Sequence, residues 1–184
     1  MVYKFIIILT LLTFVSCNKK GIGDVKRFNE KGDILLVVEI PAGTIQDYEY
    51  DFKEKGFKNR VENGVDRTIG YLPNPFNLGF IPPYKDKNKT EVIILSESYS
   101  IGTLLPGEVI GALEYTLNNK INYLFVANPK DYKYKFIKTN DISLQSEENS
   151  DIIEIIKHFV SKSKNYDFTR NILSANDANK KLRK

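Results

Sequence analysis

We interpret the segment YLPNPFNLGFIPPYKDKNKTEVIIL, residues 71–95, as the one around which the rest of this chain is organised. Its first half contains four prolines, which lack a backbone N–H and restrict the residue before them, so this half cannot be a regular helix. Its end, Thr90 to Leu95, is a short apolar run that predicts a core strand. A long loop rich in aromatic residues inside a small domain is more often functional than a simple connector. We therefore predict a functional loop over residues 75–82, which leads through a polar segment into a buried strand.

Short strands and tight turns dominate the chain before residue 130. Apolar or alternating runs predict further strands over residues 33–41, 48–52, 108–117 and 121–127. Asn63-Gly64 predicts a hairpin, because both residues accept the positive φ that a two-residue β-turn requires. The segment Asn118-Asn119-Lys120 separates the last two runs and predicts a second hairpin.

The sequence changes character after Pro129. A polar run, residues 146–150, suits a helix N-cap, and the apolar residues that follow recur at helical spacing. We predict one amphipathic helix over residues 151–162 and a second, more polar helix over residues 174–184. Strands followed by helices predict a mainly β (α+β) fold, a small β-barrel with helices at its C-terminal side.

The N-terminus has the pattern of a bacterial lipoprotein signal. Lys4 precedes the apolar run FIIILTLLTFV, which is short for a permanent membrane span and has the length of a signal-peptide core. Ser16-Cys17 resembles the end of a lipobox, where cleavage leaves a lipid-modified cysteine, although Phe14 stands where an aliphatic residue is usual. The alternative is an ordinary signal peptide or an N-terminal anchor with an incidental cysteine. We predict lipidation of Cys17, and a protein anchored to a membrane of the bacterial cell envelope on its periplasmic or outer-surface side.

Length and charge are those of a single domain without a nucleic-acid partner. The net charge of the 184 residues is +4, and the lysines alternate with acids without an arginine-rich block or base-stacking motif. Cys17 is the only cysteine, so no intramolecular disulfide can form. We divide the chain into a signal peptide (1–16), a lipid-anchored tether (17–32) and a single barrel domain with C-terminal helices (33–184).

Three segments together resemble the soluble inorganic pyrophosphatases of family I, whose core is a five-stranded OB-like closed barrel. Residues 38–51 contain VEIPA and YEYD, similar to the family's E-I-P-x and K-Y-E-x-D. Residues 65–67, VDR, and 75–82, PFNLGFIP, are similar to its D-R and Y-P-x-N-Y-G-[FY]-I-P. Residues 105–113, LPGEVIGAL, are similar to its hairpin entry. The order of these motifs implies the barrel fold, with flanking C-terminal helices.

The resemblance implies a chemistry, the Mg²⁺-dependent hydrolysis of diphosphate to two phosphates. The family holds several Mg²⁺ ions in a cup of carboxylates, where two metals lower the pKa of a water molecule. On the matching positions, Glu39, Asp86 and Glu91 would be metal ligands, and Asp86 and Glu91 would serve catalysis. Arg67 and Lys164 would bind the diphosphate or another small anion.

Several charged positions of the family pattern are missing in this chain. Residues 86–91, DKNKTE, stand where the family has D-G-D-P-x-D, so Asn88 replaces one carboxylate. Two further aspartates and a lysine are matched by Leu117, Asn122 and Leu124. Mg²⁺ needs several hard oxygen ligands in good geometry, so we expect hydrolysis to be impaired. The alternative is a catalytically inactive lipoprotein that reuses the barrel for anion binding or for structure.

Some of the surviving positions keep a second interpretation. Glu39 lies in an apolar strand, where an unpaired carboxylate is costly, so it requires a metal, Arg67 or a lysine as partner. Arg67 alternatively is a surface residue at a hairpin end, and Asp86 with Glu91 alternatively belongs to a solvated loop. Glu49 completes the surviving polar set. The family also implies a homo-oligomer, while a general OB-barrel ligand binder has no motif behind it.

Overall fold

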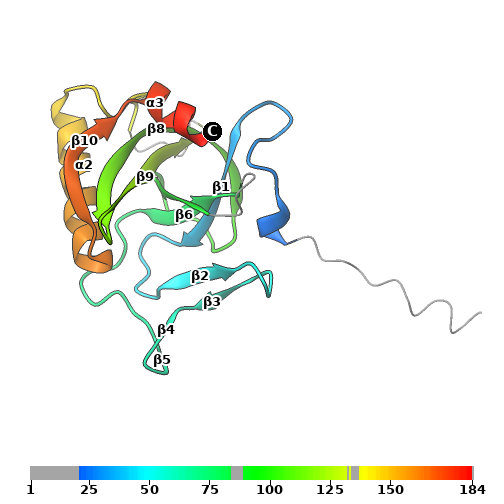
Figure 1. The fold of residues 1–184 in the computed structure, drawn as a ribbon. Coiled ribbons are helices and arrows are strands. Elements are labelled where there is room, and N and C mark those ends of the chain that lie inside the picture. Colours follow the sequence, from blue (N-terminus) through cyan, green and yellow to red (C-terminus); the bar gives the residue numbers. More distant parts are fainter. Residues whose placement is uncertain (1–20, 84–88, 132, 134–136, 184) are drawn as a thin grey trace, which may run out of the picture.

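The computed structural model describes residues 21–83, 89–131, 133 and 137–183 of the chain. The strands are β1 (Ile34–Ile40), β2 (Tyr48–Asp51), β3 (Gly56–Asn59), β4 (Val61–Glu62), β5 (Val65–Asp66), β6 (Asn77–Ile81), β7 (Thr90–Ile94), β8 (Leu104–Leu117), β9 (Lys120–Pro129) and β10 (Asp167–Leu173). The helices are the 3₁₀ turn η2 (Ile22–Asp24), α2 (Glu147–Lys164) and α3 (Ala175–Leu182). Figure 1 shows α2 beside the strands and α3 near one end of them.

Five strands close into a ring. The order is β1-β6-β7-β9-β8, and β8 pairs back to β1 through Ile34↔Gly107 to Val37↔Leu104. All these pairings are antiparallel except β7 with β9. β10 extends the sheet from β8, and the β2–β3 and β4–β5 hairpins lie outside the ring. The expected five-stranded closed barrel with C-terminal helices is confirmed.

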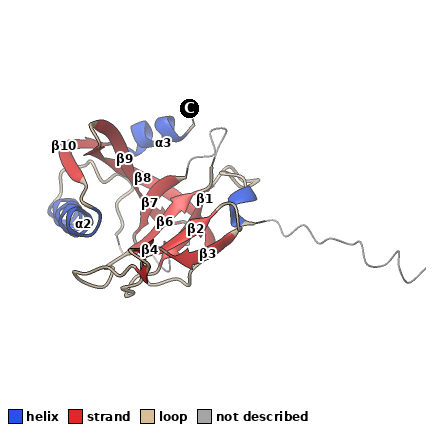
Figure 2. Cartoon of the chain, turned by 60° about the horizontal axis from the view of Figure 1, so that its bottom comes forward, coloured by secondary structure: helices blue, strands red, loops and turns tan. Residues whose placement is uncertain are grey.

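Two apolar clusters hold the helices to the barrel. Both clusters contain residues from all five strands of the ring. One of them includes Ile156 and Phe159 of α2, which lies beside the strands in Figure 1, so this cluster covers the outer faces. The other contains residues that alternate with these along the strands, such as Val92 before Ile93, and is therefore the barrel interior, with Ala178 and Leu182 of α3 packed on it. Figure 2 shows both helices outside the strands, as this layering requires.

The hairpin and helix predictions are confirmed by backbone geometry. Asn63 and Gly64 have φ of 53° and 80°, and Asn118 and Asn119 have φ of 51° and 59°, so both turns use positive-φ pairs. Ser146 caps α2 by accepting a hydrogen bond from the backbone N–H of Asn149 at 3.1 Å. The helix is longer than the predicted 151–162, because its polar first turn is already helical.

The loop predicted over residues 75–82 is wrong for most of its length. Residues 77–81 form β6, in which every residue is buried between β1 and β7. The prolines lie outside this run of five, so the backbone N–H groups of the strand are available for pairing. Gly79 permits the close approach of β1, since a Cβ there would lie 2.0 Å from the backbone oxygen of Val37.

The segment predicted as a tether, residues 17–32, is described from Gly21 onward. There Arg27 is 7% exposed and donates hydrogen bonds to the backbone oxygens of Pro82, at 3.1 Å, and Leu182, at 2.6 Å. Phe28 packs against the barrel interior. From Gly21 onward this segment therefore lies against the barrel. No helix in the described ranges is long and apolar enough to cross a membrane.

Candidate functional site: a row of alternating charges

Glu39 is bound by a lysine. It lies on β1, is 6% exposed, and accepts a hydrogen bond of 2.6 Å from the backbone N–H of Tyr50 on β2. The Nζ of Lys89 lies 2.7 Å from Oε1 and 3.0 Å from Oε2 of the same carboxylate. The prediction of a lysine partner for Glu39 is therefore confirmed, and this lysine contacts both oxygens.

Glu91 is held in the same way by residues from the C-terminal part of the chain. Glu91 lies on β7 directly before Val92, which faces the barrel interior. Because successive side chains of a strand point to opposite faces, Glu91 points outward. Its Oε1 lies 2.8 Å from the Nζ of Lys164, and its Oε2 accepts a hydrogen bond of 2.7 Å from Tyr166. Burial alone would raise the pKa of Glu91, but Lys164, Tyr166 and Lys89 together outweigh it and lower this pKa. Glu91 is therefore an ionised, fully engaged carboxylate.

The charges form a single row on the outside of the barrel. Lys89 binds Glu39 and also acts electrostatically on Glu91, which in turn binds Lys164. Each member is half-buried or more, with side-chain exposures of 7% to 24%. We refer to Glu39, Lys89, Glu91 and Lys164 as the charge row. Its formal charges sum to zero.

Two stacked tyrosines fill the space beside the charge row. The rings of Tyr115 on β8 and Tyr166 lie 4.0 Å apart and are nearly parallel, at 5°. Burial and the neighbouring charge of Glu91 raise the pKa of Tyr115 to about 12 and also raise that of Tyr166. Leu124 is 1% exposed in the same apolar cluster as Tyr115. An apolar, aromatic surface therefore borders Glu91 on this side.

A second charged cluster surrounds Asp47 on the hairpin side of the barrel. Arg67 lies 3.1 Å from Asp47 and 3.5 Å from Glu62, and donates a hydrogen bond of 3.1 Å to the backbone oxygen of Ser163. Glu49 lies 3.4 Å from Arg60. Ser163 directly precedes Lys164, so this hydrogen bond places Arg67 close to the backbone of Lys164. Both predicted phosphate-binding cations are thus near one another, and both already have acidic partners.

Family membership follows from the sequence profile of the whole domain. The family profile described as Inorganic pyrophosphatase matches residues 36–183, which include every strand of the ring except the first residues of β1. The chain belongs to the inorganic pyrophosphatase family. A search of the curated proteins found no match.

Solved structures agree with this family at the level of the fold. The chain is similar to the inorganic pyrophosphatase from Thermus thermophilus, with 19% identity and a TM-score of 0.70 over 86% of this chain and 92% of that one. It is similar to the enzyme from Coxiella burnetii, with 20% identity and a TM-score of 0.66 over 86% and 96%. It is also similar to the type I inorganic pyrophosphatase from P. falciparum, with 15% identity and a TM-score of 0.70, and the match spans 86% of this chain but 59% of that one.

The described residues of this pyrophosphatase-family chain do not form a cup for several Mg²⁺ ions. Within the described ranges, no group of three or more His, Cys, Asp or Glu side chains could hold a metal ion. Glu39 and Glu91 do not converge on a common point free of cations, because each is bound by an ammonium. Leu117 is exposed at a hairpin end, and Asn122 donates its side-chain N–H to the oxygen of Lys120. Asp86, the remaining predicted ligand, lies outside the described residues.

Sequence reasoning named the carboxylates but missed most of their partners. Lys89 had a local signal, since it is one of the lysines that lie beside Glu91 in the sequence. No local sequence signal pointed to Tyr115 or Tyr166. Tyr166 reaches Glu91 because α2 ends at Lys164 and its C-cap Asn165, with a left-handed φ of 57°, turns the chain back towards the barrel.

Proposed function

We propose that this protein is a membrane-anchored member of the inorganic pyrophosphatase family in which diphosphate hydrolysis is strongly impaired. The observation that carries the proposal is the pairing of Glu39 with Lys89 and of Glu91 with Lys164. These ammonium groups satisfy the two described carboxylates that the family pattern would use as metal ligands. The barrel then serves a role other than rapid turnover of diphosphate.

Electrostatic repulsion opposes the binding of Mg²⁺ beside the Glu39–Lys89 and Glu91–Lys164 ion pairs. At 4 Å and an effective dielectric of about 20, a divalent cation and an ammonium repel each other by about 8 kcal/mol. A Mg²⁺ ion on Glu39 or Glu91 would therefore have to displace a lysine first. Moving Lys89 or Lys164 away would also break the contact of Lys89 with Glu39, at 2.7 Å, or that of Lys164 with Glu91, at 2.8 Å. Two-metal activation of water has little support in this arrangement.

Phosphate release from diphosphate tests the proposal. The purified mature chain is assayed with and without Mg²⁺ and Mn²⁺, beside a Glu39→Gln/Glu91→Gln variant and an Asp86→Ala variant. We expect slow release that neither variant changes by more than a few-fold, because the mutated carboxylates are not serving a metal. Rapid Mg²⁺-dependent release that both variants abolish would overturn the proposal and support the full family reaction.

Attachment to the membrane is the second part of the proposal and rests on the lipobox-like Ser16-Cys17. Cys17 with two or more acyl chains would anchor the protein stably, since two hydrophobic signals suffice for that. We expect the chain expressed in a bacterium to fractionate with membranes and to gain the mass of a diacylglyceryl group. A Cys17→Ser variant should remain unmodified. Equal fractionation and mass for both chains would contradict lipidation.

Binding of a small anion without turnover is the alternative that the sequence leaves open. Arg67 and Lys164 would be its cations, but both are already engaged with carboxylates. Calorimetric titration with diphosphate in the absence of metal separates the two cases. We expect no heat of binding beyond dilution. Micromolar binding that an Arg67→Met variant loses would favour the anion-binding role.

A further inference from the structure

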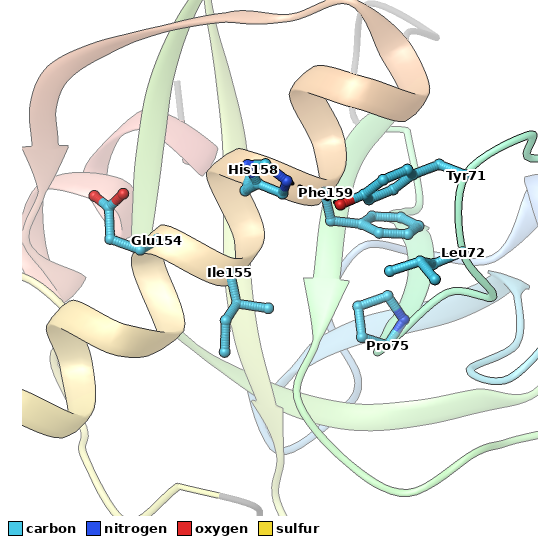
Figure 3. A pocket seen from close by; sticks show the side chains of 7 residues that line it. All are labelled: Tyr71, Leu72, Pro75, Glu154, Ile155, His158 and Phe159. Atoms are coloured by element: carbon cyan, nitrogen blue, oxygen red, sulfur yellow. Dashed lines mark hydrogen bonds between the residues drawn. The ribbon is translucent and has the colours of Figure 1, made fainter.

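An apolar groove runs between α2 and the segment before β6. It consists of two hollows of about 430 and 200 Å³ that share Pro75 and Ile155. Figure 3 shows the larger one, with Tyr71, Leu72 and Pro75 on one side and Ile155 of α2 on the other. The smaller hollow reaches core residues of the cluster beneath α2. The combined volume is in the range of protein ligand sites.

The walls of this groove are held in place by contacts of their own. The hydroxyl of Tyr71 lies 2.9 Å from Nε2 of His158, which joins the segment to α2. Phe76 and Phe159 meet edge to face, with ring centroids 5.5 Å apart. A groove with fixed walls binds a partner without first having to order its own side chains.

Large apolar side chains stand exposed along the rim. Leu72 is 53% exposed, Ile155 54% and Tyr71 45%. All three line the larger hollow. Exposed apolar groups that are scattered are ordinary, but three around one hollow form a contiguous patch, which marks an interaction surface.

Two exposed acids without a salt-bridge partner among the described residues lie beside the groove. Asp151 and Glu154 are exposed on α2, and neither forms an ion pair with any described basic residue. Both lie beyond the first turn of the helix, so the attraction of acids to a helix N-terminus does not account for them. Glu154 lines the larger hollow, and in Figure 3 it stands on the α2 side, away from Tyr71. The chain has a net positive charge, so this acidic edge is a local feature.

We propose that this groove is a docking site for a segment of a partner protein that carries apolar anchors flanked by lysine or arginine. The apolar anchors would fill the two hollows, and the basic residues would meet Asp151 and Glu154. The acidic edge extends along α2 beyond the hollows, since Asp151 lines neither of them. An extended partner therefore satisfies both features, whereas a compact small molecule satisfies one. An anionic lipid surface is disfavoured, because it would be repelled by the same acids.

Selection from a phage-displayed library of random 12-residue peptides tests this proposal. The full mature chain is the bait, and binders to a Leu72→Gln/Ile155→Gln variant are removed. We expect enriched sequences with two or more large apolar residues and an excess of Lys and Arg over Asp and Glu. A consensus peptide should lose about tenfold in affinity with Ile155→Gln and again with Asp151→Lys/Glu154→Lys. Higher salt should weaken its binding to the wild-type chain.

Matched controls and competing occupants complete the experiment. Ile121→Gln and Glu30→Gln change exposed residues outside the groove and should leave peptide affinity unaltered. Circular dichroism confirms that each variant is folded. The proposal is overturned if no peptides are enriched, if the enriched ones are acidic, or if the groove variants bind them equally. It is also overturned if Ile155→Gln instead dissociates a dimer of this chain in light scattering, or abolishes binding to phosphatidylglycerol vesicles.

Discussion

The ring of five strands and the charge row on its outer face differ in how they depend on individual residues. The ring needs apolar residues of suitable volume at alternating positions, and many sequences satisfy that need. The charge row needs particular groups at particular distances, so a single lysine beside a carboxylate changes which cation that carboxylate binds. Both are built on the same strands, since β1 carries Val38 and Glu39, and β7 carries Glu91 and Val92.

This difference explains how a chain with 15% to 20% identity to solved pyrophosphatases keeps their fold. Burial of apolar side chains is non-directional and is shared among many contacts. A metal cup is directional and depends on a few ligands, so the loss of those ligands would leave the barrel intact.

Gly79→Ala should have the largest effect, because it tests the ring itself. The new Cβ would meet the backbone oxygen of Val37 at 2.0 Å, and no side-chain movement relieves a clash with backbone. We expect a loss of more than about 3 kcal/mol in the free energy of unfolding, measured by urea denaturation. Gly70→Ala is the matched control, since nothing lies within 4 Å of its Cβ position. Equal stabilities would show that the β1–β6 contact is not close.

Glu91→Gln should have the next largest effect, because it leaves Lys164 with a partner that carries no charge. Removing one member of a largely buried ion pair costs about 3 kcal/mol. Lys180→Met, which removes the exposed pair with Asp177, should cost less than about 1 kcal/mol. Because folding lowers the pKa of Glu91, its stabilisation is present above the pKa of an unfolded glutamate. It should be lost on acidification through the lower folded pKa, so the difference between wild type and Glu91→Gln should shrink in acid.

The stacked tyrosines should make the protein sensitive to alkali. Tyr115 has a folded pKa of about 12, above the ordinary 10.0, because of burial and Glu91. A raised folded pKa gives stability that is present below about pH 10 and lost as the pH rises through about 12. Ultraviolet titration of tyrosinate should show late-ionising tyrosine that shifts to lower pH in Glu91→Gln. Tyr71→Phe, an exposed position, should leave that late phase unchanged.

Mg²⁺ should have the smallest effect, because the charge row already supplies its own cations. We expect no change in the thermal midpoint of the wild-type chain when Mg²⁺ is added. In Lys89→Met the carboxylate of Glu39 loses its cation, so Mg²⁺ should stabilise that variant by about 1 kcal/mol. Lys55→Met, which removes an exposed pair with Asp24, should show no response. A clear rise in the thermal midpoint of the wild type with Mg²⁺ would mean that the metal displaces the lysines from the carboxylates.

Elements that depend on local signals were predictable from the sequence. The two positive-φ hairpins, the strand of residues 34–40 and the capped helix α2 all follow from residue type and spacing. β6 was missed because its neighbouring prolines suggested a loop, and strand pairing on both sides decided otherwise. β10 was missed because its exposed and half-buried residues show no regular apolar pattern, and it is a strand through its pairing with β8.

The barrel and the family follow from apolar periodicity, turn residues and ordered motifs, all of which are local properties of the sequence. The need of Glu39 for a partner is also visible in the sequence, since a carboxylate in an apolar strand cannot remain unpaired. Which partners the carboxylates have depends on how distant parts of the chain pack together. Lys164 and Tyr166 lie 73 and 75 residues from Glu91 in the chain, and they reach it only when α2 is packed on the barrel. Long-range contacts of this kind leave no local pattern in the sequence, so the partners within the charge row could not be predicted from it.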